Sequence, residues 1–183
     1  MSVIFIDLGC SNGKVIDLAF NAMDGLPRLK YDKVYAFDPI RVPEWDDAKW
    51  DSYDANIQFF ECAMGDAQGV ASLAMTDNPE ARTLVMANEN FSGSDKKRVK
   101  VIDFSAWLKA NVRFEDTIVV KMDIEGAEYG VLEKLIHDKT IDYINHLFVE
   151  WHDRLMREDQ REQFTEREAK IREACKIPIQ HWV

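Results

Sequence analysis

A glycine-containing loop directly follows the first apolar run of the chain. The segment Asp7-Leu8-Gly9-Cys10-Ser11-Asn12-Gly13 places two glycines four residues apart, between a predicted strand and a predicted helix. Glycine lets the backbone approach a ligand closely, and the amides of a helix N-terminus point into the same space. A dinucleotide-binding loop would read G-x-G-x-x-G, and the Asp7 carboxylate would repel a pyrophosphate. The loop therefore predicts a site for a cationic or amine-bearing ligand, with a plain glycine turn as the alternative.

Two further apolar runs end in segments that suit a nucleoside. Asp38-Pro39 follows the second run, where Rossmann-like folds place an acid that accepts hydrogen bonds from ribose hydroxyls. The third run ends in Cys62-Ala63-Met64-Gly65-Asp66. Its small and apolar side chains suit an adenine ring, with Met64 stacking on the ring and Asp66 contacting the amine. A simple turn is the alternative for this segment.

A fourth segment follows the most apolar run and reads Lys121-Met122-Asp123-Ile124-Glu125-Gly126-Ala127-Glu128. This octet resembles the K-x-D-x-E-G-x-E hallmark of the FkbM family of S-adenosylmethionine-dependent methyltransferases. Phe5–Gly13 and Phe37-Asp38-Pro39 are also similar to segments of that family, and the resemblance covers about residues 3–152. The chain departs from the family in two ways. Asp38 stands where Glu is common, and the helices that often precede the first strand are expected to be absent.

The resemblance implies a Rossmann-like class I methyltransferase fold with S-adenosylmethionine as the cofactor. The glycine loop would then hold the methionine portion, and the ends of the second and third runs would hold the ribose and the adenine. The implied cofactor-binding residues are Asp7, Gly9, Cys10, Ser11, Asn12, Gly13, Asp38, Pro39, Ala63, Met64, Asp66 and Asp123. The implied activity is O-methylation of a hydroxyl on a sugar or on another small-molecule or glycan acceptor.

The catalytic candidates on the acceptor side are Asp123, Glu125 and His152. An alcohol is a poor nucleophile while protonated, so a nearby base helps. Asp123 ends a strand and is the first candidate, and His152 is the second because an unperturbed histidine titrates near neutrality. Glu125 and Glu128 also fit a structural role, since acids are favoured in the first turn of a helix. Asp123, Glu150 and His152 could instead hold a divalent cation, but their spacing does not require one, so no metal ligand is assigned.

Lys121 lies inside a predicted strand that should be covered on both faces. A buried ammonium group needs an opposite charge nearby. In a methyltransferase-like strand order, Asp7, Asp123 and Glu150 would end neighbouring strands. We therefore expect Lys121 to neutralise these carboxylates, with an edge lysine that reaches solvent as the alternative.

Strands and helices alternate along the chain in the order that these sites require. Strands are predicted over residues 3–7, 33–38, 57–62, 69–75, 98–103, 116–124, 144–151 and 177–183. Helices are predicted from the glycine loop to about Phe20, over 104–111, from Glu125-Gly126 to about His137, and on the surface within 153–176, packed on one edge of the sheet. A long loop is expected over 76–97. This order predicts an α/β fold with a mostly parallel central sheet and flanking helices, in a single domain over residues 1–183.

Composition and charge limit the classes of function. The chain has 183 residues, 46% of them hydrophobic, and a formal net charge of −10. That charge opposes a nucleic-acid partner, and a D/N-P-P-aromatic motif is not found where an amino-methylating nucleic-acid enzyme carries it. No apolar run is long enough to span a membrane, and three cysteines without a CxxC pair fit a reducing compartment. We therefore expect a cytoplasmic protein without a membrane partner. A homo-oligomer and a catalytically silent methyltransferase-like binding module stay open.

Overall fold

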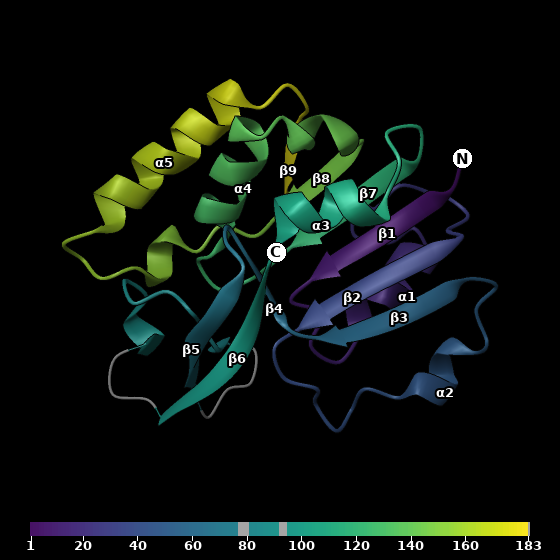
Figure 1. The fold of residues 1–183 in the computed structure, drawn as a ribbon, viewed down its shortest axis with the longest axis horizontal. Helices are drawn as coiled ribbons and strands as arrows, with labels where there is room; N and C mark the ends of the chain where they lie inside the picture. Colours follow the sequence, from purple (N-terminus) through teal and green to yellow (C-terminus); the bar gives the residue numbers. More distant parts are fainter. Residues whose placement is uncertain (77–80, 92–94, 183) are drawn as a thin grey trace.

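The central sheet contains six parallel strands in the order β3-β2-β1-β7-β8-β9 (Figure 1). The structure is a computed structural model that describes residues 1–76, 81–91 and 95–182. The strands of this sheet are β1 (Val3–Leu8), β2 (Lys33–Asp38), β3 (Asn56–Glu61), β7 (Thr117–Met122), β8 (His146–Val149) and β9 (Ile179–His181). A second sheet has the order β4-β6-β5 and contains β4 (Ala63–Gly65), β5 (Gly69–Met75) and β6 (Asp95–Asp103).

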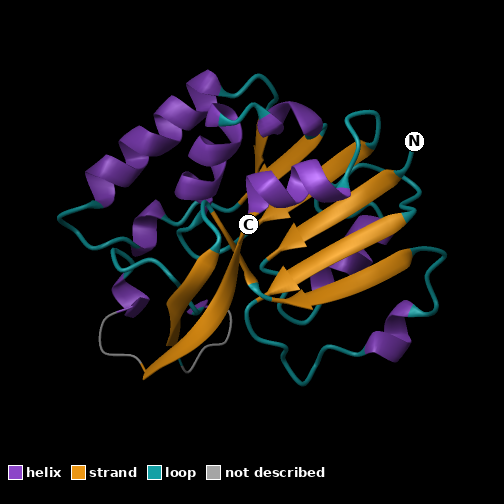
Figure 2. Cartoon of the chain, in the orientation of Figure 1, coloured by secondary structure: helices purple, strands orange, loops and turns teal. Residues whose placement is uncertain are grey.

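Helices cover both faces of the central sheet (Figure 2). The α-helices are α1 (Lys14–Phe20), α2 (Asp47–Trp50), α3 (Phe104–Asn111), α4 (Glu128–His137) and α5 (Arg161–Ala174), and short 3-10 helices span Glu89–Phe91, Thr140–Tyr143 and Asp153–Leu155. Strand β1 divides its side chains between the two faces: Ile4 and Ile6 pack with α3 and α4, whereas Phe5 packs with α1. Both faces of the central strands are buried, which explains their nearly continuous apolar sequence.

The strand order places a crevice between β1 and β7. The chain runs outward from β1 through β2 to β3 and then returns to add β7 on the opposite side of β1. In open parallel sheets a ligand binds outside the carboxyl ends of the strands, at the point where the order reverses. The predicted α/β fold with a parallel central sheet is confirmed, and this topology brings the segments after β1, β2 and β7 to one edge.

The predicted surface helix over 153–176 is wrong in its extent and in its packing. A 3-10 turn covers Asp153–Leu155, and the α-helix begins only at Arg161. Met156 interrupts the helix because its side chain is fully buried and its backbone forms a bridge with Asn88. Helix α5 then buries Phe164 and Ile171 and lies beside α4 (Figure 1), not on an edge of the sheet.

The other predicted boundaries differ by a few residues. The third run divides into β3 and β4, which belong to different sheets. The strand predicted over 116–124 ends at Met122, because the chain turns sharply at Glu125, where φ is 55°. Residues 77–80 and 92–94 of the predicted loop, and Val183 of the predicted last strand, lie outside the described residues.

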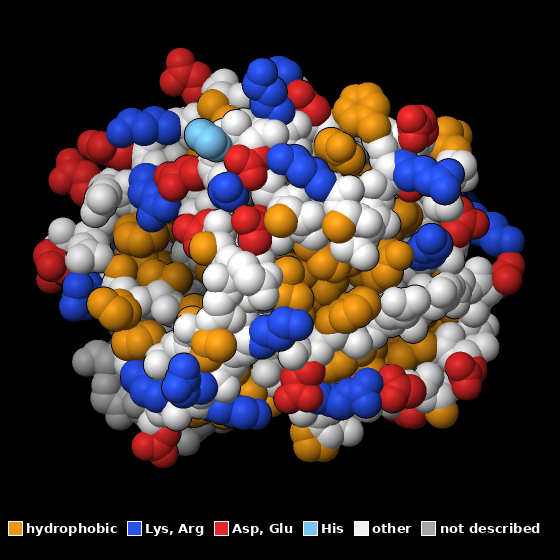
Figure 3. All heavy atoms as spheres, viewed as in Figure 1, with side chains coloured by type: hydrophobic (Ala, Val, Ile, Leu, Met, Phe, Trp, Pro, Cys, Tyr) orange, Lys and Arg blue, Asp and Glu red, His pale blue; other side chains and the backbone are white. Residues whose placement is uncertain are grey.

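The charge of the chain is unevenly distributed. Lysine and arginine side chains gather over the outer end of the hairpin formed by β5 and β6 (Figure 3), where Lys96, Lys97, Arg98 and Lys100 are exposed. The described residues contain no helix that is long and apolar enough to cross a membrane. The hairpin is thus basic on a chain whose net charge is −10.

Candidate active site

A cavity of about 510 Å³ lies at the carboxyl ends of the parallel strands. Loops after β1, β2, β3, β7 and β8 form its wall, and the segment between β5 and β6 contributes further residues. The residues singled out in the sequence that line it are Gly9, Cys10, Ser11, Asn12, Asp38, Pro39, Ala63, Met64, Lys121, Asp123, Glu125 and Glu150. The volume falls within the range typical of small-molecule and cofactor sites.

The glycine loop approaches the neighbouring strands closely. Gly9 has a φ of 79°, and a Cβ atom placed on it would lie 1.8 Å from the backbone oxygen of Asp123. The amides of Gly9 and Cys10 donate to the carbonyl of Phe37 on β2, at 2.9 and 3.1 Å. These contacts fix the loop between β2 and β7, and only glycine fits at position 9.

Asp38 is held by the backbone on both sides. Its Oδ2 accepts a hydrogen bond from the Ser11 amide at 3.1 Å, and its Oδ1 accepts one from the Ile40 amide at 2.9 Å. Burial raises the pKa of this carboxyl group, and the two amide hydrogen bonds oppose that effect. A carboxylate oxygen can accept two hydrogen bonds, and each oxygen of Asp38 accepts one from the backbone. Each oxygen can therefore accept a second hydrogen bond, from a ligand hydroxyl in the cavity.

Lys121 links the ends of β1 and β7. Its Nζ lies 3.3 Å from Asp7 Oδ1 and 3.2 Å from Asp123 Oδ2, and it donates a 2.9 Å hydrogen bond to the Gly9 carbonyl. Burial alone would lower the pKa of Lys121, but Asp7 and Asp123 outweigh burial and raise it. The expected pairing of Lys121 with these two carboxylates is therefore present, with one ammonium group shared between them. Glu150 differs, because it pairs with Arg154 at 3.0 Å.

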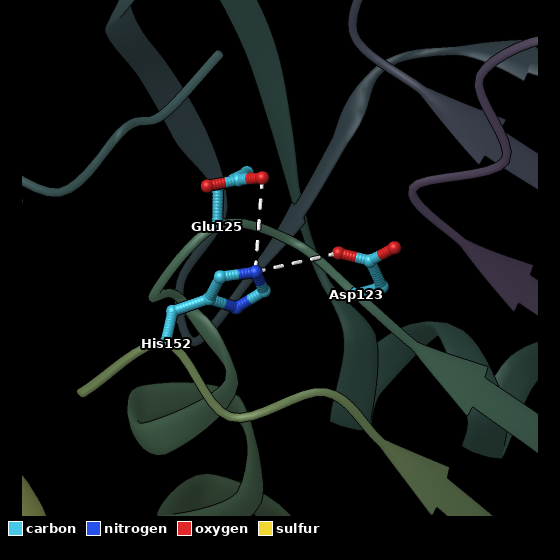
Figure 4. A group of neighbouring side chains, drawn as sticks. All are labelled: Asp123, Glu125 and His152. Atoms are coloured by element: carbon cyan, nitrogen blue, oxygen red, sulfur yellow. Dashed lines mark ion pairs between the residues drawn. The ribbon is translucent and has the colours of Figure 1, made fainter. Parts of the chain in front are cut away.

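His152 is buried among four carboxylate groups. Figure 4 shows Asp123, Glu125 and His152 pointing toward one another. The Nε2 atom of His152 lies 3.6 Å from Asp123 Oδ1, 3.7 Å from Glu125 Oε1 and 3.6 Å from Glu150 Oε1. The Nδ1 atom lies 3.0 Å from Glu128 Oε1. The ends of β7 and β8 thus bring all three predicted catalytic residues together.

Glu128 holds the loop between β7 and α4. The Ile124 amide donates to its Oε1 at 2.7 Å, and the Gly126 amide donates to its Oε2 at 2.9 Å. The loop needs this support because Glu125 and Gly126 both have positive φ angles, of 55° and 102°. Of the two glutamates that the sequence placed in the first helical turn, Glu128 is the first residue of α4 and Glu125 belongs to the loop.

Burial and neighbouring charges change the titration of two groups in this cluster. Burial raises the pKa of Glu125 to about 7, with His152 opposing the change and the nearby acids adding to it. Burial alone would lower the pKa of His152, but its hydrogen bond with Glu128 and the surrounding carboxylates raise it to about 9. The two shifts favour the neutral form of Glu125 and the charged form of His152.

Some predicted cofactor-binding residues do not line the cavity. Asp7 is fully buried against Lys121, and Gly13 packs against Trp50 at the start of α1. Asp66 lies outside the cavity because its carboxylate turns toward Gly130 on α4, where a Cβ atom would come within 3.1 Å of Oδ2. Asp66 is therefore not among the residues that line the cavity, and its contact with adenine stays a prediction.

The segment between β5 and β6 adds residues that sequence reasoning missed. Ala81, Arg82, Leu84 and Asn90 line the cavity. Thr83 Oγ1 and Asn88 Nδ2 donate to the Glu125 carbonyl at 2.7 and 3.1 Å, which fastens the segment to the loop after β7. The only signal in the sequence was the length of the predicted loop, since long loops are often functional.

The fold and the cavity define the class of protein. A six-stranded parallel sheet flanked by helices, with a cavity where the strand order reverses, is the architecture of a Rossmann-like methyltransferase. The family model for the methyltransferase FkbM domain matches residues 8–176. The chain belongs to the FkbM methyltransferase family, so the resemblance carried by the octet Lys121–Glu128 is confirmed. No curated protein and no solved structure matches the chain.

Proposed function

We propose that the protein uses S-adenosylmethionine to methylate a hydroxyl oxygen on a sugar or on another small-molecule or glycan acceptor. One observation carries this proposal. A single cavity contains the glycine loop and Asp38, which suit an adenosyl ligand, and also the carboxylates of Asp123 and Glu125, which suit a reacting hydroxyl. Membership of the family supports methyl transfer, and the shape and charge of the cavity support this choice of cofactor and acceptor.

Three groups of cavity residues would each bind one part of the cofactor. The loop from Gly9 to Asn12 would hold the methionine portion, Asp38 the ribose, and Ala63 with Met64 the adenine. When bound, S-adenosylmethionine supplies a methyl group on a positively charged sulfur. Asp123 lies in the cavity wall at the carboxyl end of β7, where its negative charge favours a cation.

The end of the cavity that would bind the methyl acceptor contains a group that can take a proton and residues that hold this group in place. In-line transfer breaks the carbon–sulfur bond as the carbon–oxygen bond forms, and the hydroxyl proton must leave the acceptor. Glu125 would take that proton, because it lines the cavity and its Oε2 is buried with no hydrogen-bond partner among the described residues. Glu128 and His152 act as positioning residues, since Glu128 fixes the loop that carries Glu125.

Calorimetric titration tests the choice of cofactor. We expect the folded protein to bind S-adenosylmethionine and S-adenosylhomocysteine and not NADH, and then to methylate members of a panel of hydroxylated sugars. Binding of NADH alone would overturn the proposal. Binding of the adenosyl ligands with no turnover on any acceptor would favour the silent binding module.

Replacing Asp38 with Ala is expected to weaken the affinity for S-adenosylmethionine by about 1–3 kcal/mol, or roughly 5–150-fold, because the ribose hydroxyls lose their acceptor. Calorimetry on a variant with an unchanged circular dichroism spectrum measures the effect. The matched control is Asp54→Ala, since the Asp54 side chain is 90% exposed and pairs with Lys30. Equal affinity in Asp38→Ala and the wild type would remove the ribose assignment.

A further inference from the structure

The carboxylates around His152 exceed the cations that contact them. Asp123, Glu125, Glu128 and Glu150 all lie within 3.7 Å of the imidazole nitrogens. Among the described residues, the lysine and arginine groups that pair with these four acids are Lys121, on Asp123, and Arg154, on Glu150. Lys121 is also shared with Asp7. Because like charges buried together are costly, a cation among these acids is favoured, whether it is a bound metal ion or the imidazolium form of His152.

The imidazole of His152 is oriented as in a metal ligand. Its side chain is only 2% exposed, and its Nδ1 is held by Glu128 at 3.0 Å. A histidine that binds a metal through one nitrogen usually has the other nitrogen hydrogen-bonded to a carboxylate or a carbonyl group. The remaining nitrogen, Nε2, points at three carboxylate oxygens from 3.6–3.7 Å, which is too far for a good hydrogen bond to any of them.

Two further features indicate that an ion fits at this point. One donor atom each from Asp123, Glu125 and His152 lie within 4.8 Å of one another. Ligand atoms on opposite sides of a small divalent ion are separated by about 4–4.5 Å, because each bond is about 2.0–2.2 Å long. Glu125 Oε2 is also buried with no hydrogen-bond partner, so the carboxylate has bonding capacity that the described residues leave unused.

We propose that Asp123, Glu125 and His152 bind a divalent metal ion at the acceptor end of the cavity. Two carboxylates and one imidazole suit an ion of the Mg²⁺ or Mn²⁺ type, with Zn²⁺ as the competitor that imidazole favours. Glu150 lies on the same side of the imidazole, and Glu128 supports the histidine from behind. The role of the ion rests on the proposed function: it would bind the acceptor hydroxyl beside Asp123 and favour transfer of the hydroxyl proton to the Glu125 oxygen that does not bind the ion.

Manganese binding tests this site without any acceptor. Mn²⁺ titrated into the full chain is followed by the electron paramagnetic resonance signal of the free aqueous ion. We expect that signal to fall with a stoichiometry of one ion per chain and to return when Mg²⁺ is added in excess. His152→Gln, Asp123→Asn and Glu125→Gln should each weaken binding at least about tenfold, and Glu128→Gln about 10–100-fold.

The matched control is His137→Gln, because the His137 side chain is 83% exposed and pairs with Asp138, outside the cluster. Its affinity for Mn²⁺ should equal that of the wild type. Circular dichroism spectra identify any variant that does not fold. Because four variants are compared, the test does not depend on whether any single variant folds. The inference is overturned if the wild-type protein takes up neither Mn²⁺ nor Zn²⁺. A proton on Nε2 of His152 would then be the positive charge that faces the carboxylates. Unchanged binding in His152→Gln and Asp123→Asn would overturn it as well.

Titration of S-adenosylmethionine into the same preparations separates the two proposals. Binding of the adenosyl ligand without uptake of Mn²⁺ or Zn²⁺ overturns the metal site and supports the proposed function. Uptake of one Mn²⁺ per chain that depends on His152, without binding of the adenosyl ligand, supports the metal site and overturns the proposed cofactor.

Discussion

Replacing Lys121 with Met is expected to lower the free energy of unfolding by about 3–5 kcal/mol, the usual cost of removing one partner from a buried ion pair. Asp7 is fully buried, and in the part of the chain that the structure describes neither of its carboxylate oxygens has a hydrogen-bond partner. Lys121 is the cation beside it, at 3.3 Å. Methionine fills a similar volume, so the effect would come from the uncompensated carboxylate and from the lost hydrogen bond to the Gly9 carbonyl.

Urea unfolding followed by tryptophan fluorescence measures this cost. Lys134→Met is the matched control, because Lys134 pairs with Asp138 at 3.1 Å but its side chain is 34% exposed. Exposed ion pairs contribute about 0–1 kcal/mol, so the control should lose little. The double variant Asp7→Asn with Lys121→Met removes both charges and should recover part of the loss. A double variant no more stable than Lys121→Met would show that the lost charge on Asp7 is not the cause.

The sheet and much of the site could be predicted because the patterns that encode them are local. The apolar runs that become β1, β2 and β7 are each followed by a polar segment, and parallel strands bring such segments to one edge. The expectation that Lys121 neutralises Asp7 and Asp123 used the same reasoning. The expectation was wrong for Glu150, because this carboxylate pairs with Arg154, four residues further along the chain.

The remaining features depend on contacts between distant segments, for which the sequence carries no periodic signal. Thr83 and Asn88 reach the Glu125 carbonyl across about forty residues of chain, through single hydrogen bonds. Met156 sits in a helical pattern and is nevertheless drawn into the core, where its Cε would lie 2.5 Å from a Cβ on Gly126. Asp66 likewise lies outside the cavity because it directly follows β4, and β4 belongs to the second sheet.

Replacing Gly9 with Ala is expected to destabilise the protein by about 2–5 kcal/mol. A left-handed conformation costs a non-glycine residue about 1–2 kcal/mol, and forcing an atom into a packed site typically costs about 1–3 kcal/mol more. The new methyl group would meet the Asp123 backbone oxygen at 1.8 Å, and backbone yields less readily than a side chain. Relief of the contact requires Asp123 to move, so the affinity for S-adenosylmethionine should fall together with stability.

Gly25→Ala separates the two contributions, because Gly25 has the same φ of 79°. Apart from its two chain neighbours, no described residue has an atom within 4 Å of a Cβ added there. It should lose only the conformational part, about 1–2 kcal/mol, and keep the affinity of the wild type for the adenosyl ligand. Urea unfolding and calorimetry on both variants give the comparison. If the two alanine variants lose equal stability, the contact between the glycine loop and the Asp123 carbonyl does not restrict the residue at position 9. Glycine at position 9 would then serve the turn alone, and the link between the cofactor loop and the acceptor-side carboxylate would have to run through Lys121.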